Sequence, residues 1–173
     1  MNFFFRILFI MSCSLSNTAY SAGYQLGNIN MNITLTNAVK IVVQKPGGGW
    51  YTMMTLDNGS GIDTSIYQNT LPIEVQLNGT DSFNVSIYQD LVLKNTKNSS
   101  LSFTTEKILF GKDKESMQTL TQNPLGFRIT DKVNGIYNQI FNLSVVARMP
   151  VRKNVDVTGS YSGNLTLVFE PTL

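Results

Sequence analysis

Apolar and polar residues alternate with a period of two along most of the chain that follows residue 28. This period places the apolar side chains on one face of an extended strand. No apolar stripe with the spacing of a helix reaches a comparable length. The alternating sets are Val39/Ile41/Val43, Ile73/Val75/Leu77, Phe83/Val85/Ile87, Leu101/Phe103, Phe127/Ile129, Phe141/Leu143/Val145 and Leu165/Leu167/Phe169.

Turn-forming residues separate these runs. The segments are "KPGGGW" at 45–50, "LDNGSG" at 56–61, "LNGTD" at 77–81, "KNTKNSS" at 94–100, "TQNPLG" at 121–126 and "KVNGIY" at 132–137. Many short strands with regular turns are typical of an antiparallel β-sandwich, because one face of each strand can then be buried. We therefore predict one all-β domain.

The first residues have the layout of a secretory signal peptide. Arg6 and the amino terminus supply positive charge, residues 7–15 form a short apolar run, and small residues follow at Ala19 and Ser21. Cleavage after Ser21, within one residue, predicts a signal peptide over residues 1–21. We expect the chain to be exported.

The composition narrows the candidate chemistry. The chain has 13 basic and 11 acidic residues, a net charge of +2, no histidine and one cysteine, Cys13, within the predicted signal peptide. So balanced a charge does not indicate nucleic-acid binding. Histidine, the commonest general base and metal ligand in proteins, is absent from the chain. Asp113 and Glu115 are the only close carboxylates, and a solvated loop explains them better than catalysis does. We predict no enzymatic activity, cofactor or metal.

Two groups of residues are candidate ligand contacts. Trp50 and Tyr51 could stack on a sugar, and Arg148 and Arg152 could bind an anionic group. The alternatives are that the tryptophan belongs to the core and that the basic residues are simply solvated. Functional patches usually show several convergent groups, which favours these alternatives.

The stretch "NINMNITLT" at 28–36 places four large apolar residues on one side, namely Ile29, Met31, Ile33 and Leu35. Apolar residues continue at odd-numbered positions as far as Val43, interrupted only at Asn37. An extended chain from Ile29 to Val43 would span about 50 Å at about 3.3 Å per residue. A domain of this size is only about 40 Å across. A turn at Asn37 would shorten the strand. Without such a turn, one half of the segment projects beyond its own domain. We expect the projecting half to add as a strand to an incomplete sheet of another chain.

Three segments resemble the CS1-type (CFA/I-like, alternate-chaperone) pilins of the chaperone–usher fimbriae. They are "MNITLTNAVKIVVQ" at 31–44, "FNVSIYQDLVLKNTKNSSLSFTTEKILFGK" at 83–112 and "YSGNLTLVF" at 161–169. Residues 44–72 match this pattern poorly. The absence of cysteine from the mature chain agrees with the resemblance.

The resemblance implies an immunoglobulin-like sandwich that lacks its last strand. It implies a donor-strand extension at 22–36, a pilin domain at 37–173, and the four apolar residues of "NINMNITLT" as donor residues. The implied acceptor groove is formed by Tyr161, Gly163, Leu165, Leu167 and Phe169. The implied partners are a periplasmic fimbrial chaperone, an outer-membrane usher and neighbouring pilin subunits. The function implied is a structural subunit of an adhesive fimbria, exported through the periplasm to the cell surface and polymerised by donor-strand exchange after capture by the chaperone. The alternative is a minor or tip subunit that acts as an adhesin for a host glycan or protein, with a host-cell receptor as its partner.

Overall fold

The structure, a computed structural model, describes residues 39–58, 63–152 and 154–172. The predicted signal peptide, and the predicted donor strand with it, lie outside the described residues. The described residues form strands, turns and loops, and no helix among them is long and apolar enough to cross a membrane. The strands are β1 (Lys40–Gln44), β2 (Ile66–Asn78), β3 (Ser82–Ile87), β4 (Leu93–Asn95), β5 (Ser102–Gly111), β6 (Gln118–Thr119), β7 (Leu125–Arg128), β8 (Lys132–Val133), β9 (Ile136–Arg148), β10 (Tyr161–Ser162) and β11 (Leu167–Pro171).

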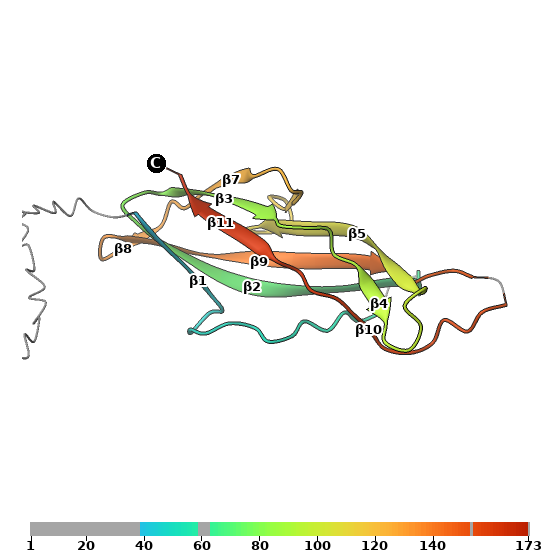
Figure 1. The fold of residues 1–173 in the computed structure, drawn as a ribbon. Helices are drawn as coiled ribbons and strands as arrows, with labels where there is room; N and C mark the ends of the chain where they lie inside the picture. The colour runs from blue at the N-terminus through green and yellow to red at the C-terminus, as the bar shows by residue number, and fades with distance from the viewer. Residues whose placement is uncertain (1–38, 59–62, 153, 173) are drawn as a thin grey trace, which may run out of the picture. The chain divides into compact units, whose positions relative to one another are not determined.

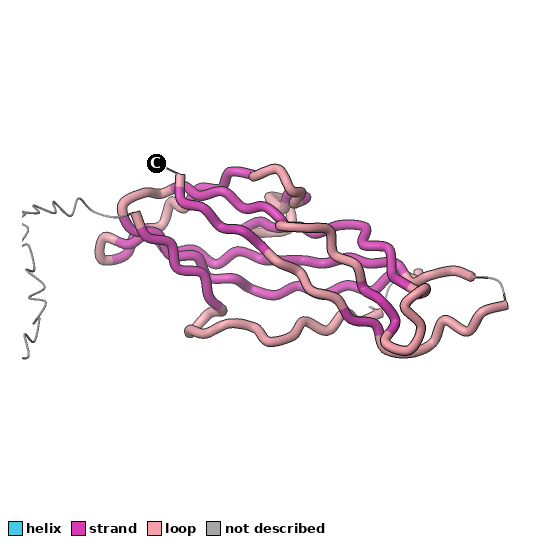
Figure 2. Tube along the Cα trace, in the orientation of Figure 1, coloured by secondary structure: helices cyan, strands magenta, loops and turns pink. Residues whose placement is uncertain are grey.

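The described strands form two antiparallel sheets (Figures 1 and 2). The larger sheet has the order β1-β2-β9-β5-β4-β10, with β6 added to β5 and β8 added to β9. The smaller sheet has the order β11-β3-β7 and forms a second layer in Figure 1. The predicted all-β antiparallel sandwich is therefore confirmed. Residues 112–117, which contain the close carboxylates Asp113 and Glu115, form the turn between β5 and β6.

The two longest strands, β2 and β9, pair from Ile66–Arg148 to Leu77–Tyr137. Their inward side chains are the apolar residues of the alternating pattern, and all are buried: Ile73, Val75, Leu77, Phe141, Leu143 and Val145. The period of two thus fixes which face of this pair packs against the second sheet. The strand predicted from Leu165 is shorter in the structure, because β11 begins at Leu167.

Five phenylalanines join the two sheets at the centre of the core. Phe110 and Phe141 come from the larger sheet and stack with ring centroids 5.1 Å apart. Phe83, Phe127 and Phe169 come from the three strands of the smaller sheet. The Phe83 ring lies 5.4 Å from Phe141, 5.8 Å from Phe127 and 6.3 Å from Phe169. Each sheet therefore holds the other through this cluster.

Phe83→Ala should lower the free energy of unfolding by about 3–5 kcal/mol, because the ring is fully buried and its loss leaves a cavity between the sheets. Denaturant unfolding followed by circular dichroism would measure the change. Tyr88→Ala is the matched control, since the Tyr88 side chain is 70% exposed. A loss in Phe83→Ala no larger than that in the control would contradict the central position of this cluster.

Candidate functional site

An apolar groove of about 1140 Å³ runs along the C-terminal part of the chain. One wall is the segment Gly159–Phe169, and the other is the segment Trp50–Leu56. Buried core residues of β2 and β9, including Ile73 and Val145, line it as well. Core side chains therefore form part of the lining of the groove.

The C-terminal wall contains all five residues that the sequence assigns to an acceptor groove: Tyr161, Gly163, Leu165, Leu167 and Phe169. The four side chains among them are half-buried. They lie at every second position, so they face the same side of an extended segment. Their place along the groove is established by the structure, while their role in binding a strand stays a prediction.

The edge of β11 that faces away from β3 is unpaired among the described strands, because β11 is the outermost strand of its sheet. On the paired side, Thr166 O accepts a hydrogen bond from Tyr88 N–H and Thr172 N–H donates one to Ser82 O, each at 2.9 Å. Backbone groups alternate in direction along an antiparallel strand. Leu167 and Phe169 therefore direct N–H and C=O groups away from β3. An extended chain lying there could hydrogen-bond to them.

The opposite wall, Trp50–Leu56, follows a loop in which three consecutive glycines have positive φ: Gly47 (84°), Gly48 (99°) and Gly49 (78°). These angles are strained for other residues and turn the chain away from β1. The wall has no ladder with β2 and is half-buried only at Tyr51, Met54 and Leu56. Their side chains pack against the core.

Trp50 and Tyr51, the candidate sugar contacts, both belong to this wall. Trp50 is 50% exposed, and its ring lies edge-on to Tyr51 with centroids 6.3 Å apart. The Tyr51 hydroxyl donates a hydrogen bond to Pro72 O at 2.8 Å. Sequence reasoning missed Met54 and Leu56, because the spacing from Tyr51 to Met54 breaks the period of two. The apolar residues of the segment "YTMMTL" at 51–56 could have indicated a partly buried stretch.

Gly163 allows the C-terminal wall to approach the chain before β4. A Cβ at this position would lie 2.3 Å from the carbonyl oxygen of Val92, a backbone atom that cannot rotate away. The chain can therefore follow this path only if residue 163 has no side chain.

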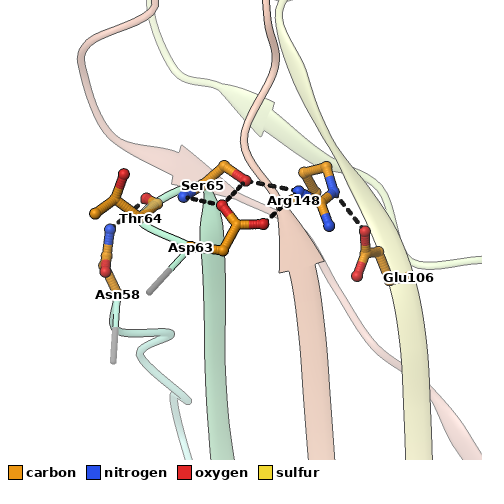
Figure 3. Close-up of polar contacts among 6 residues, drawn as sticks. All are labelled: Asn58, Asp63, Thr64, Ser65, Glu106 and Arg148. Carbon is orange, nitrogen blue, oxygen red and sulfur yellow. Dashed lines mark hydrogen bonds and ion pairs between the residues drawn. The ribbon is translucent and has the colours of Figure 1, made fainter. Parts of the chain in front are cut away.

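Arg148, a candidate anion contact, is bound by two carboxylates (Figure 3). Its Nε lies 2.5 Å from Glu106 Oε1, and its Nη1 lies 2.8 Å from Asp63 Oδ2. Glu106 falls where the β5–β9 register shifts, and such a bulge can re-aim a side chain. The hydrogen bond that Arg148 donates to Asp63, and next the one that it donates to Glu106, raise the pKa of Arg148. This geometry joins β5 and β9 to the start of β2.

Arg152 and Asp113, one of the two close carboxylates, each form a hydrogen bond with a backbone group. Arg152 donates to Ser100 O at 3.3 Å. The backbone N–H of Ser116 donates to the exposed Asp113 carboxylate at 2.9 Å, and the hydrogen bonds from Ser116 lower the pKa of Asp113. Among the residues that the structure describes, no cluster of three or more His, Cys, Asp or Glu could hold a metal. Ligand binding by Arg148 and Arg152 stays a prediction.

Gly163→Ala should destabilise the C-terminal wall, because its Cβ would collide with the Val92 carbonyl. We expect a lower melting temperature and faster amide exchange at Val168 and Glu170, whose N–H groups face β3, measured by hydrogen–deuterium exchange. Gly126→Ala is the matched control, since the nearest atom to its Cβ is Asn84 Oδ1 at an ordinary 3.5 Å. Equal effects of the two substitutions would contradict the requirement for glycine at 163.

Asp63→Asn should alter the pH dependence of stability. The side-chain and backbone hydrogen bonds of Ser65, followed by that of Arg148, lower the pKa of Asp63 from 3.8 to about 2. A lowered pKa adds stability above the unfolded value and loses it as pH falls through the folded value. The wild-type chain should therefore melt above Asp63→Asn at neutral pH, and this difference should shrink between pH 3.8 and about 2.

Ser65→Ala is the informative second variant for this pH dependence, because Ser65 supplies the largest contribution to the lowered pKa of Asp63. Its melting temperature should change less than that of the wild type over the same acidic range. A melting difference between wild type and Asp63→Asn that persists unchanged at pH 2 would contradict this account.

Comparison with known proteins bears on the fold. No family model matches the sequence, and no curated protein matches it either. The structure is similar to the CooA pilin subunit from enterotoxigenic Escherichia coli, with a TM-score of 0.58, 15% sequence identity, and coverage of 75% of this chain and 85% of that chain. A second structure comes from work on a chaperone–tip adhesin complex in the activation of CFA/I fimbriae biogenesis. It aligns with a TM-score of 0.42 and 16% sequence identity, and the alignment covers 76% of this chain and 42% of that chain. The chain therefore has the fold of a pilin subunit, as its resemblance to the CS1-type pilins predicts.

Proposed function

We propose that this chain is a structural subunit of an adhesive fimbria and that it polymerises by donor-strand exchange. The observation that carries the proposal is the apolar groove beside the unpaired edge of β11. The occupant is the segment at 28–36 from a neighbouring copy, which alternates with the same period as the wall it would meet.

Strand addition uses both properties of the groove. The backbone of the incoming strand pairs with Leu167 and Phe169, and its apolar residues cover the exposed part of the core. Burial of Ile29, Met31, Ile33 and Leu35 would contribute about 1.5–3 kcal/mol each before the cost of ordering the strand. An unpaired edge with apolar neighbours is otherwise a site for uncontrolled association.

This hazard gives a reason for the implied partners. A periplasmic chaperone that lends a strand to the same groove would protect the edge of β11 until assembly. An outer-membrane usher would then exchange that strand for the segment of the next subunit. Neither step needs catalytic groups, a cofactor or nucleic acid, which agrees with the composition of the chain. The surface fimbrium is the destination that this route implies.

A complementation experiment tests the exchange. Ile33→Asp should disable a chain as donor, because a charged side chain would enter the apolar groove. Leu167→Asp should disable a chain as acceptor for the same reason. Neither variant should polymerise alone, whereas their mixture should form one-to-one complexes and the wild type should form multimers. Light scattering coupled to size-exclusion chromatography would measure the masses.

Matched controls keep this experiment specific. Val168→Asp places the same charge in β11, at a residue that does not line the groove. Asn32→Asp places the same charge in the donor segment, on its polar side. Both should assemble as the wild type does. Multimers of Ile33→Asp alone, or no complex in the mixture although Ile33→Asp is folded, would overturn the proposal.

A further inference from the structure

The hairpin of β8 and β9 exposes two large apolar side chains. Val133 and Ile136 are paired across it and are 62% and 41% exposed. Residues directly opposite each other in an antiparallel pair have their side chains on the same face. Asn134 and Gly135 join them with positive φ angles of 50° and 85°, which suit a two-residue hairpin turn. The hairpin therefore presents the two apolar side chains next to each other.

This hairpin lies at the end of the sheet where β1 begins (Figure 1). Tyr137 of β9 is opposite Leu77 of β2, and Leu77 is opposite Ile41 of β1. The order β1-β2-β9-β8 separates β1 from β8 by three strand spacings, about 14 Å. The chain that precedes β1, with the segment at 28–36, is therefore joined to the sheet beside the hairpin.

The length of this connection restricts where a neighbouring copy can lie. From Leu35 to Lys40 the chain advances five residues, which reach at most about 18 Å. If the segment at 28–36 fills the groove of a neighbour, that neighbour must lie against this end of the sheet. The exposed hairpin then faces it.

The groove indicates which end of the neighbour is met. Its lining includes Val43 and Phe169 but neither Ile41 nor Pro171, which lie two residues further along β1 and β11 toward the hairpin end. β1 and β11 are in contact with each other. The groove therefore ends on that side. A segment within it must leave toward the opposite end to rejoin its own domain.

At that opposite end the lining continues to Tyr161 and to exposed Gly159. Residues 149–160 connect β9 to β10 there, and two of their apolar side chains are exposed, Val151 at 84% and Val155 at 45%. The loop is held in place beside the groove, because the Tyr161 hydroxyl donates a hydrogen bond to Val157 O at 2.7 Å. Each end of the domain thus carries exposed apolar residues.

We propose that the two ends form a second contact between neighbouring subunits: Val133 and Ile136 in the hairpin of the donor pack on Val151 and Val155 of the subunit whose groove the donor fills. The inference rests on the proposed function, and the partner is a second copy of this chain. The contact joins different surfaces of the two copies, so it repeats along a filament without closing. It would fix the angle between subunits that the connection at 37–39 alone leaves free.

The test uses the one-to-one complex of the Leu167→Asp chain, the donor, with the Ile33→Asp chain, the acceptor. Adding Val133→Asp to the donor should make dissociation about 5- to 20-fold faster, because a charge would face apolar residues. Adding Val151→Lys to the acceptor should do the same. With both present the charges are opposite, and the rate should return to within about threefold of the parent complex.

Dissociation can be followed by native mass spectrometry during a chase with excess ¹⁵N-labelled donor chain. Tyr88→Asp in the donor is the matched control, since Tyr88 is equally exposed but belongs to neither patch. Exchanging the two substitutions between the chains gives a readout of direction. In a one-to-one complex the hairpin of the acceptor and the loop of the donor face solvent, so neither substitution should then change the rate.

The outcomes separate the two proposals. Absence of any complex between the folded parent chains would contradict the proposed function itself. A complex whose dissociation is unchanged by Val133→Asp in the donor would overturn the second contact and leave donor-strand exchange standing. Equal effects in both placements would overturn its direction. Failure of the combined substitutions to recover the rate would overturn the pairing of the hairpin with the 149–160 loop.

Discussion

The need of every strand for hydrogen-bonded neighbours is the constraint on which this structure depends. The larger sheet ends at β1 and the smaller sheet ends at β11, and each of these two strands has one edge unpaired among the described strands. The apolar groove lies beside these two edge strands. The phenylalanine cluster holds the sheets together, while the edge strands beside the groove have backbone groups without a partner among the described strands.

The sequence predicted the C-terminal wall well and the other wall poorly, for a physical reason. Leu165, Leu167 and Phe169 follow the period of two, so their common face could be read from the residue types, whereas Tyr161 and Gly163 were implied by the resemblance to the CS1-type pilins. Trp50–Leu56 follows a glycine loop and is held by single side-chain hydrogen bonds, which leave no periodic signal. Asn69 in particular looks like any polar residue in a strand, and its position beside Thr70 and Thr55 is visible only in the structure.

The ion pairs of Arg148 show a second limit of sequence reasoning. Its partners Asp63 and Glu106 lie 85 and 42 residues away, and the Glu106 side chain belongs to an irregular position in β5. Alternation predicts ordinary strand positions, whereas the side chain at a bulge follows no period. The basic residue could be identified in the sequence, but the carboxylates that it binds could not.

Phe169 belongs both to β11, which has one unpaired edge among the described strands, and to the central cluster, where its ring lies 6.3 Å from Phe83 and 5.8 Å from Phe110. A ligand that binds the folded form and not the unfolded chain raises the free energy of unfolding of the whole domain by mass action. A strand bound in the groove would therefore also stabilise the core, which Phe169 connects to the groove. In any linear assembly of such subunits, the copy with the empty groove would be the least stable one, and heat would dismantle the assembly from that end.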